Sequence, residues 1–213
     1  MTRQEILKVA KPILFNTEMV RAIMDDRKTV TRRVLKLQPY KCIDNNEHEF
    51  VKDSDLSDEF TGFLCHKCGC GVCSPHGKYP VGTSWIRPKY KVSDYLYVRE
   101  TWGIYEQSYM DANYILYRAD FPNGAKTFGA DCVSCDLPTW RPSIHMPKAA
   151  ARIFLRVTDV RVERLSEITD EQALKEGLAS RADFISTFLK IYPSCTEESW
   201  VWVVSFERVE VEP

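Results

Sequence analysis

The chain has 213 residues, and its 29 basic and 30 acidic side chains give a formal net charge of -1. This balance excludes a protein that attracts nucleic acid through its overall charge, although a local basic run can still contact phosphate groups. A hydrophobic content of 44% is typical of a globular protein, and the length fits one domain with an insertion. No apolar stretch approaches the ~20 residues that span a bilayer, and residues 1–11 are too polar for a signal peptide. We therefore expect a cytoplasmic protein that makes no membrane contact.

The first part of the chain predicts a helix between two strands. Residues 12–15 suit a short apolar strand, and Asn16 suits the N-cap of a helix that continues to about Asp26. The apolar residues of this helix recur at helical spacing, at Met19, Val20, Ile23 and Met24. The β-branched character of residues 29–34 then predicts a second strand.

Residues 44–90 have the composition of an insertion. The segment begins with a polar, acidic stretch without a clear period, continues with a cysteine cluster and ends in a run rich in Gly and Pro. Strands are expected again at 95–100 and 113–119, and residues 120–147 predict a loop-rich segment.

Two further strands are expected near the C-terminus. The first spans residues 151–165 and is expected to bend near Thr158 and Asp159, and the second covers residues 201–211.

Two helices are expected between these strands. Thr169 and Gln172 form a capping box at the start of the first helix, and Gly177 suits its C-terminal cap. The second helix is expected to start near Ser180 and to bury the apolar residues Phe184, Ile185, Phe188 and Leu189.

The segment Arg27-Lys-Thr-Val-Thr-Arg-Arg33 lies at the junction between the first helix and the second strand. Backbone ends and polar side chains converge at such a junction, so Lys28, Thr31, Arg32 and Arg33 could contact a small ligand. The alternative is a solvated basic turn that binds nothing.

Five blocks of the sequence resemble the ASCH-domain family, in particular its longer phage and prophage members. The blocks follow one another in family order and cover the chain outside the insertion. They are Lys11–Phe15, Met19–Ile23, Arg27–Arg33, Asp94–Trp102 and Trp140–Pro147.

The resemblance implies an α+β fold: a PUA-like β-barrel with flanking helices, here as a single domain over residues 1–213. Proteins of this kind bind RNA or modified nucleobases, and some small members hydrolyse N4-acetylcytidine to cytidine and acetate. Others are associated with RNA cleavage, which we favour less here. The lysine and second threonine of the hydrolases fall on Lys28 and Thr31, and a glutamate on the helix after the long strand falls on Glu176.

These residue types suit amide hydrolysis. Thr31 could act as the nucleophile if Lys28, kept neutral by burial and by Arg32 and Arg33, took its proton. Glu176 could then protonate the leaving amine or orient water. The structural alternative is that Thr31 only belongs to a strand and that Glu176 is solvated. The chain also departs from the family, because it is longer and has Ser93 where relatives commonly have glycine before the aspartate.

The cysteines predict a structural zinc site. Cys65-His-Lys-Cys68-Gly is half of a zinc knuckle, and Cys132-Val-Ser-Cys135 offers a second half. An insertion with so few apolar residues needs such a site to hold it together, which favours a structural over a catalytic metal.

Two alternatives to this pairing stay open. Cys65 and Cys68 could pair with Cys70 and Cys73, but Gly69 alone separates the two halves, which makes the return to one tetrahedral ion difficult. The cysteines could also all be free thiols.

Aromatic and polar residues in the resembling blocks are candidates for base recognition. Trp102, Trp140, Arg141 and His145 could stack on or hydrogen-bond a base, although a lone histidine is more often structural. Glu100 follows a strand whose apolar residues face the core, so its carboxylate is expected to be buried and to need a partner such as an arginine.

The sequence supports three functional hypotheses. The protein could hydrolyse an N-acylated base such as N4-acetylcytidine, or it could bind RNA or a modified base without chemistry. It could also be a phage accessory protein that acts on a host factor. The residue pattern favours a nucleic-acid or nucleoside ligand and leaves hydrolase and reader open.

Overall fold

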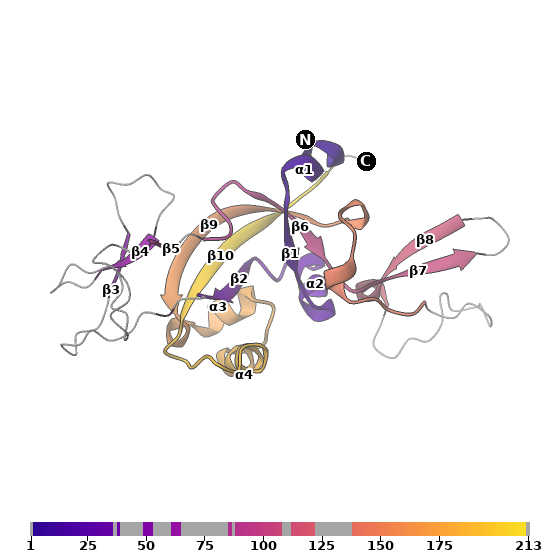
Figure 1. The fold of residues 1–213 in the computed structure, drawn as a ribbon. Coiled ribbons are helices and arrows are strands. Elements are labelled where there is room, and N and C mark those ends of the chain that lie inside the picture. The colour runs from indigo at the N-terminus through magenta and orange to yellow at the C-terminus, as the bar shows by residue number, and fades with distance from the viewer. Residues whose placement is uncertain are drawn as a thin grey trace.

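The computed structural model describes residues 2–35, 38, 49–52, 61–64, 85–86, 88–107, 112–121 and 138–211. The fold is mixed α+β, as expected (Figure 1). Its α-helices are α1 (Arg3–Val9), α2 (Thr17–Met24), α3 (Asp170–Lys175) and α4 (Arg181–Ile191). Short 3-10 helices cover Arg118–Asp120, Ser143–His145, Lys148–Ala150 and Leu165–Glu167.

The strands form three sheets. The main sheet contains β1 (Lys11–Leu14), β6 (Tyr95–Arg99), β9 (Phe154–Arg164), β10 (Trp200–Val209) and β2 (Val30–Val34), in that order. A separate sheet contains β3 (Glu49–Lys52), β4 (Thr61–Leu64) and β5 (Trp85–Ile86), which fall within the range expected for the insertion. The third is a hairpin of β7 (Trp102–Gln107) and β8 (Ala112–Tyr117).

The main sheet is curled, as the curved strands β9 and β10 show (Figure 1), but it is not closed into a barrel by the strands that the structure describes. β1 pairs with β6 in parallel, and the remaining neighbours are antiparallel. The two edge strands β1 and β2 approach each other, because the Arg33 Nη2 of β2 donates a hydrogen bond of 2.9 Å to the Leu14 carbonyl of β1. A side chain, and not a backbone ladder, thus links the two edges.

The long strand β9 bends where the sequence indicates. Ser205 pairs with Asp159 and Phe206 pairs with Val157, so Thr158 is an extra residue on β9. Such a bulge shifts the alternation of side chains by one position. Val157 before it and Val160 after it therefore both pack into the same apolar cluster.

The two faces of the sheet pack against different helices. Alternating residues of β10 lie on opposite faces: Val204 and Phe206 pack with α2, whereas Val201 and Val203 pack with α3 and α4. The pairing of β2 with β10 extends this division. Thr31 lies opposite Val204, and Arg32 lies opposite Val203. Thr31 and Arg32, which are adjacent in the chain, consequently face the apolar clusters on opposite sides of the sheet.

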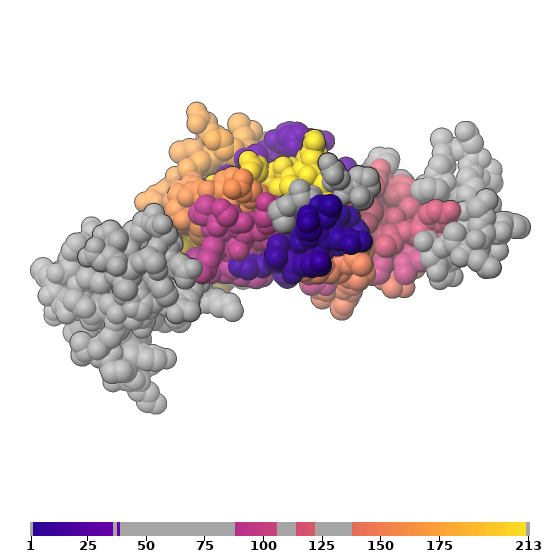
Figure 2. All heavy atoms as spheres, turned by 90° about the horizontal axis from the view of Figure 1, so that it is seen from above, coloured from indigo at the N-terminus to yellow at the C-terminus, as the bar shows by residue number. Residues whose placement is uncertain are grey.

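The chain termini meet in a third apolar cluster. Ile6 of α1 is fully buried there, and Val209 at the end of β10 packs against the same cluster. Figure 2 shows α1 in indigo beside the yellow C-terminal strand. Helix α1 was not expected from the sequence, although Thr2 and Glu5 form a capping box at its start.

The helix ends follow the expected capping chemistry. The side chains of Asn16, Thr169 and Ser180 accept hydrogen bonds from the first turns of α2, α3 and α4. Gly177 follows α3 with a φ of 84°, as expected for a glycine at this end. In the part of the chain that the structure describes, no helix has the length and apolar character needed to cross a membrane.

Replacing Gly177 by alanine should destabilise the fold by about 2–4 kcal/mol. The positive φ disfavours any Cβ, and an added Cβ would also lie 2.7 Å from the Ala22 Cβ of α2. Urea unfolding of Gly177→Ala measures the loss. The double variant Gly177→Ala/Ala22→Gly should recover only the part of the lost stability that comes from the clash between the two Cβ atoms. A Gly177→Ala variant as stable as the wild type would contradict the close approach of α2 and the end of α3.

Candidate functional site

Lys28 lies in the turn between α2 and β2, before strand pairing begins. Asp26 has a φ of 55°, which turns the chain back after the helix. The backbone N–H groups of Arg27 and Lys28 both donate to the Ala22 carbonyl, at 2.8 and 2.9 Å. Thr29 N–H then donates to the Lys175 carbonyl at 2.9 Å. These bonds fix the turn against α2 on one side and the end of α3 on the other.

The Lys28 ammonium group is enclosed by three oxygen acceptors. Its Nζ donates to Glu176 Oε2 at 2.7 Å, to the Glu176 carbonyl at 2.9 Å and to the Val30 carbonyl at 2.8 Å. The Lys28 side chain is 0% exposed and that of Glu176 is 2% exposed. The ring of Phe15 lies on the other side, 5.4 Å from Nζ. The predicted pair of Lys28 and Glu176 is therefore brought together inside the protein.

Arg32 is part of the same buried network. Its Nη1 donates to Glu176 Oε1 at 3.3 Å, and its Nη2 donates to Glu163 and Gln172 at 2.8 Å each. Its guanidinium also lies over the Phe184 ring. Its Nε is buried and has no partner among the described residues. These contacts direct Arg32 toward α3 and Glu176 and away from solvent.

The electrostatic balance disfavours the charged form of Lys28. Burial lowers its pKa below the ordinary value of 10.5, and the Glu176 carboxylate opposes this effect. The like charges of Arg33 and Arg32 lower the pKa further. A lysine with a lowered pKa can act as a base nearer to neutral pH.

Thr31 and Arg33 face the other side of β2. Thr31 is 1% exposed and lies opposite Val204, on the face that packs with α2. Arg33 points the same way, since its guanidinium lies 5.4 Å from the Phe15 ring and bonds to Leu14. Phe15 is thus contacted by both Lys28 and Arg33. At this ring the Lys28–Glu176 pair approaches the residues of β2 that face α2.

A second buried carboxylate has the arginine partner that the sequence requires. Glu100 is 1% exposed, and Arg152 binds it with two hydrogen bonds, of 2.9 and 3.0 Å. Arg152 also donates to Asp120 at 2.8 Å and lies 3.9 Å from the Tyr117 ring centre. Burial raises the pKa of Glu100, and the hydrogen bonds and charge of Arg152 oppose that rise.

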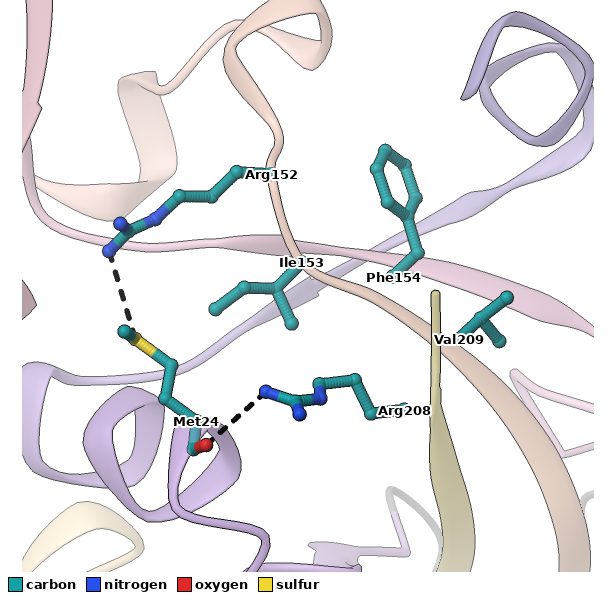
Figure 3. A pocket seen from close by; sticks show the side chains of 6 residues that line it. All are labelled: Met24, Arg152, Ile153, Phe154, Arg208 and Val209. Carbon is teal, nitrogen blue, oxygen red and sulfur yellow. Dashed lines mark hydrogen bonds between the residues drawn. The ribbon is translucent and has the colours of Figure 1, made fainter. Parts of the chain in front are cut away.

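A cavity of about 180 Å³ opens beside this second cluster (Figure 3). Arg152 and Arg208 point into it from opposite sides and converge on Met24 of α2. Arg208 donates to the Met24 carbonyl at 3.2 Å and to Asp26 at 3.4 Å. Arg152 and Arg208 are therefore both held at the C-terminal end of α2.

The remaining predicted base-binding residues lie around the foot of the β7–β8 hairpin. Trp102 is buried and exchanges backbone hydrogen bonds with Arg141, whose guanidinium lies over its ring. Trp140 is half-buried between Phe121 and Arg118. Arg141 and His145 are exposed. These side chains form a group that is separate from the contacts of Lys28.

No family model, curated protein or solved structure matches the chain. The assignment of the site therefore depends on its residues and their geometry.

The predicted zinc ligands lie outside the described residues. Cys65, Cys68, Cys132 and Cys135 are not among the positions that the structure describes. Within the described ranges, no three His, Cys, Asp or Glu side chains are grouped so that they could hold a metal ion. The zinc site stays a prediction.

The sequence did not identify several residues that hold the two clusters. Glu163 and Gln172 bind Arg32, and Arg152 binds Glu100. Gln172 was expected only as a capping residue, and its Oε1 accepts from both Thr169 N–H and Arg32. The requirement for a cationic partner at Glu100 was the one sequence feature that pointed to Arg152.

Replacing Glu100 by glutamine should cost about 1–3 kcal/mol of stability, because Arg152 loses a buried, doubly bonded carboxylate. Asp120→Asn is the matched control. Its carboxylate is 38% exposed and should contribute about 0–1 kcal/mol. Chemical unfolding of both variants tests the difference, and equal losses would contradict the central role of the Glu100 contact.

Proposed function

We propose that the protein is an ASCH-type hydrolase directed at a nucleoside or at RNA, which removes an acyl group from the exocyclic nitrogen of a base such as N4-acetylcytidine. The observation that carries this proposal is the contact between Lys28 and Glu176, at 2.7 Å in a buried site where the pKa of Lys28 is lowered. Replacing a buried ion pair by apolar residues is often neutral or stabilising, so stability alone gives little reason to keep one.

The chemistry assigns one step to each residue. In amide hydrolysis the bond between the acyl carbon and the exocyclic nitrogen breaks, and water supplies a hydroxyl to the acyl group and a proton to the amine. Lys28 first gives a proton to the Glu176 carboxylate in contact with it, and the resulting neutral amine takes the proton of the attacking hydroxyl, that of Thr31 or of water. Glu176, in contact with Lys28 and Arg32, passes a proton toward the leaving amine.

A PUA-like barrel is part of the proposal. Its support is the curl of the main sheet, whose edge strands β1 and β2 are linked by the bond from Arg33 to Leu14. The helices that flank both faces of this sheet add to that support.

A panel of modified nucleosides tests the proposed reaction. Purified protein is incubated with N4-acetylcytidine, other N-acylated nucleosides and their unmodified parents, and products are separated by chromatography. We expect release of the free nucleoside and the carboxylic acid from at least one acylated substrate. Absence of turnover on every acylated nucleoside and on acylated RNA would reject the hydrolase.

A non-catalytic reader of RNA or of a modified base is the second candidate. It is favoured by the complete burial of the Lys28 side chain, which presents no amine to solvent, and by the exposure of Arg141 and His145. A reader would bind the same panel of nucleosides and leave every one of them intact.

We also propose a structural zinc ion held by Cys65, Cys68, Cys132 and Cys135. The support is the spacing of the two Cys-x-x-Cys pairs. Metal analysis of purified protein should find about one zinc per chain. The content should fall to background in Cys65→Ser/Cys68→Ser. A metal-free protein that keeps its thermal transition with all four cysteines replaced by serine would contradict the site.

A further inference from the structure

A cavity of about 600 Å³ lies on the outer side of the two chain segments that carry Lys28 and Glu176. Arg27 lines it from the turn before β2, and Lys175 and Gly177 line it from the end of α3. Lys28 is thus the chain neighbour of one lining residue, and Glu176 lies between two others. The position of α3 below β2 can be followed in Figure 1.

Gly177 lines this cavity and packs beside the Lys28 side chain. A Cβ built at Gly177 would lie 3.4 Å from the Lys28 Cβ and 3.8 Å from its Cδ. The hydrogen bond from Thr29 N–H to the Lys175 carbonyl joins the two walls at 2.9 Å. A ligand in contact with Gly177 would consequently lie beside the chain segments that carry Lys28 and Glu176.

The lining combines apolar surface with exposed cations. Leu174 is 55% exposed, and Leu178 beside it is half-buried, which leaves an uncovered aliphatic floor. Arg27 and Lys175 are both exposed at the cavity. The volume lies within the roughly 300–1,000 Å³ range of small-molecule sites, which are mostly apolar with a few placed polar groups.

Two carboxylates counter these cations. Glu171 lines the cavity, and Asp25 pairs with Arg27 at 2.8 Å. The side chains of Arg27 and Asp25 are 56% and 58% exposed. Ion pairs with such exposure contribute about 0–1 kcal/mol to stability. A phosphate group, which binds a guanidinium through two parallel hydrogen bonds, can therefore displace Asp25 from Arg27.

We propose that this cavity binds the phosphate-bearing part of a nucleotide, with the ring system against Leu174 and Leu178 and the phosphate at Arg27 and Lys175. The inference depends on the nucleoside-directed function proposed above and narrows it. The substrate is a phosphorylated nucleoside, free or within RNA, and the cavity anchors it beside the Lys28 pair.

Calorimetric titration with cytidine and cytidine 5′-monophosphate tests the anchor. We expect the monophosphate to bind at least about tenfold more tightly, a difference of about 1.4 kcal/mol. Arg27→Gln and Lys175→Gln should each remove most of that preference, and Glu171→Gln should increase it. Lys190→Gln, an exposed lysine on α4, is the charge-matched control and should change nothing. Equal affinity for the two probes, or a preference that survives Arg27→Gln/Lys175→Gln, would overturn the inference.

A trinucleotide RNA distinguishes the two sources of phosphate. Tighter binding of the trinucleotide than of the monophosphate, lost in Lys175→Gln, assigns the anchor to an RNA backbone, and the reverse order assigns it to a free nucleotide. The test of the phosphate anchor can fail or succeed independently of the test for hydrolysis. A phosphate preference without any turnover rejects the reaction and keeps the anchor, whereas turnover without a phosphate preference keeps the reaction and rejects the anchor.

Discussion

Replacing Glu176 by glutamine should lower the free energy of unfolding by about 3–5 kcal/mol, because it leaves the buried Lys28 ammonium without a counter-charge. Lys28 would keep only uncharged acceptors, whereas Arg32 would still have Glu163. Denaturant unfolding at neutral pH measures the change. A loss below about 1 kcal/mol would show that Lys28 is already neutral in the folded protein at that pH.

The matched control for this substitution is Glu163→Gln. Glu163 shares Arg32 with Glu176 but is 16% exposed, and Arg161 also binds it at 2.6 Å. Solvent screening should reduce its contribution to about 1–2 kcal/mol. A Glu163 variant less stable than the Glu176 variant would place the electrostatic centre of the network at Arg32 instead of Lys28.

The pH dependence of stability has a sign that follows from the lowered pKa of Lys28. Between that pKa and 10.5, the unfolded chain holds a proton that the folded chain has released. Stability therefore rises with pH across this window, and Lys28→Met should lack the rise. Burial raises the pKa of Tyr90 to about 12, which acts in the opposite direction above pH 10. The comparison of wild type with Lys28→Met is thus best made between about pH 7 and about pH 10.

The local features of the fold could be predicted because they depend on short-range chemistry. The caps at Asn16 and Thr169 and the glycine at 177 fix helix ends through contacts within a few residues. The bend at Thr158 follows from the break in alternation along a single strand. Helix α1, which was not expected, carries the same kind of capping box at Thr2 and Glu5, and this is the local signal that could have predicted it.

The long-range partners could not be predicted from one sequence. The parallel pairing of β1 with β6 joins Ile13 to Val98, and no local pattern specifies it. The same holds for Arg152, which lies 52 positions from Glu100. Lys28 and Glu176 lie 148 positions apart. The resemblance to the ASCH-domain family assigned both residues to one site, whereas composition and periodicity did not.

Burial also changes the role that the sequence suggested for Arg32. In the linear sequence it is one of several basic residues that could contact a ligand. Its 0% exposed side chain is instead used to hold Glu176, Glu163 and Gln172, so its charge acts on Lys28 and not on solvent. Arg27, which faces solvent at the same turn, is the residue available to an external anion.

Replacing Lys28 by arginine should reduce hydrolysis by at least about 100-fold while ligand binding changes little, since arginine keeps the charge but does not deprotonate near neutral pH. Because the side chain is fully buried, Lys28→Met is made alongside; it fills similar space and leaves Glu176 paired with Arg32. Thermal unfolding and calorimetric binding of each variant separate loss of chemistry from loss of fold. Both variants should remain folded, bind the acylated nucleoside and fail to release product.

If the protein is a reader, neither change removes any turnover and affinity alone shifts modestly. Hydrolysis that persists undiminished in Lys28→Arg and in Thr31→Ala would contradict the catalytic assignment and direct the search toward Glu100 and His145.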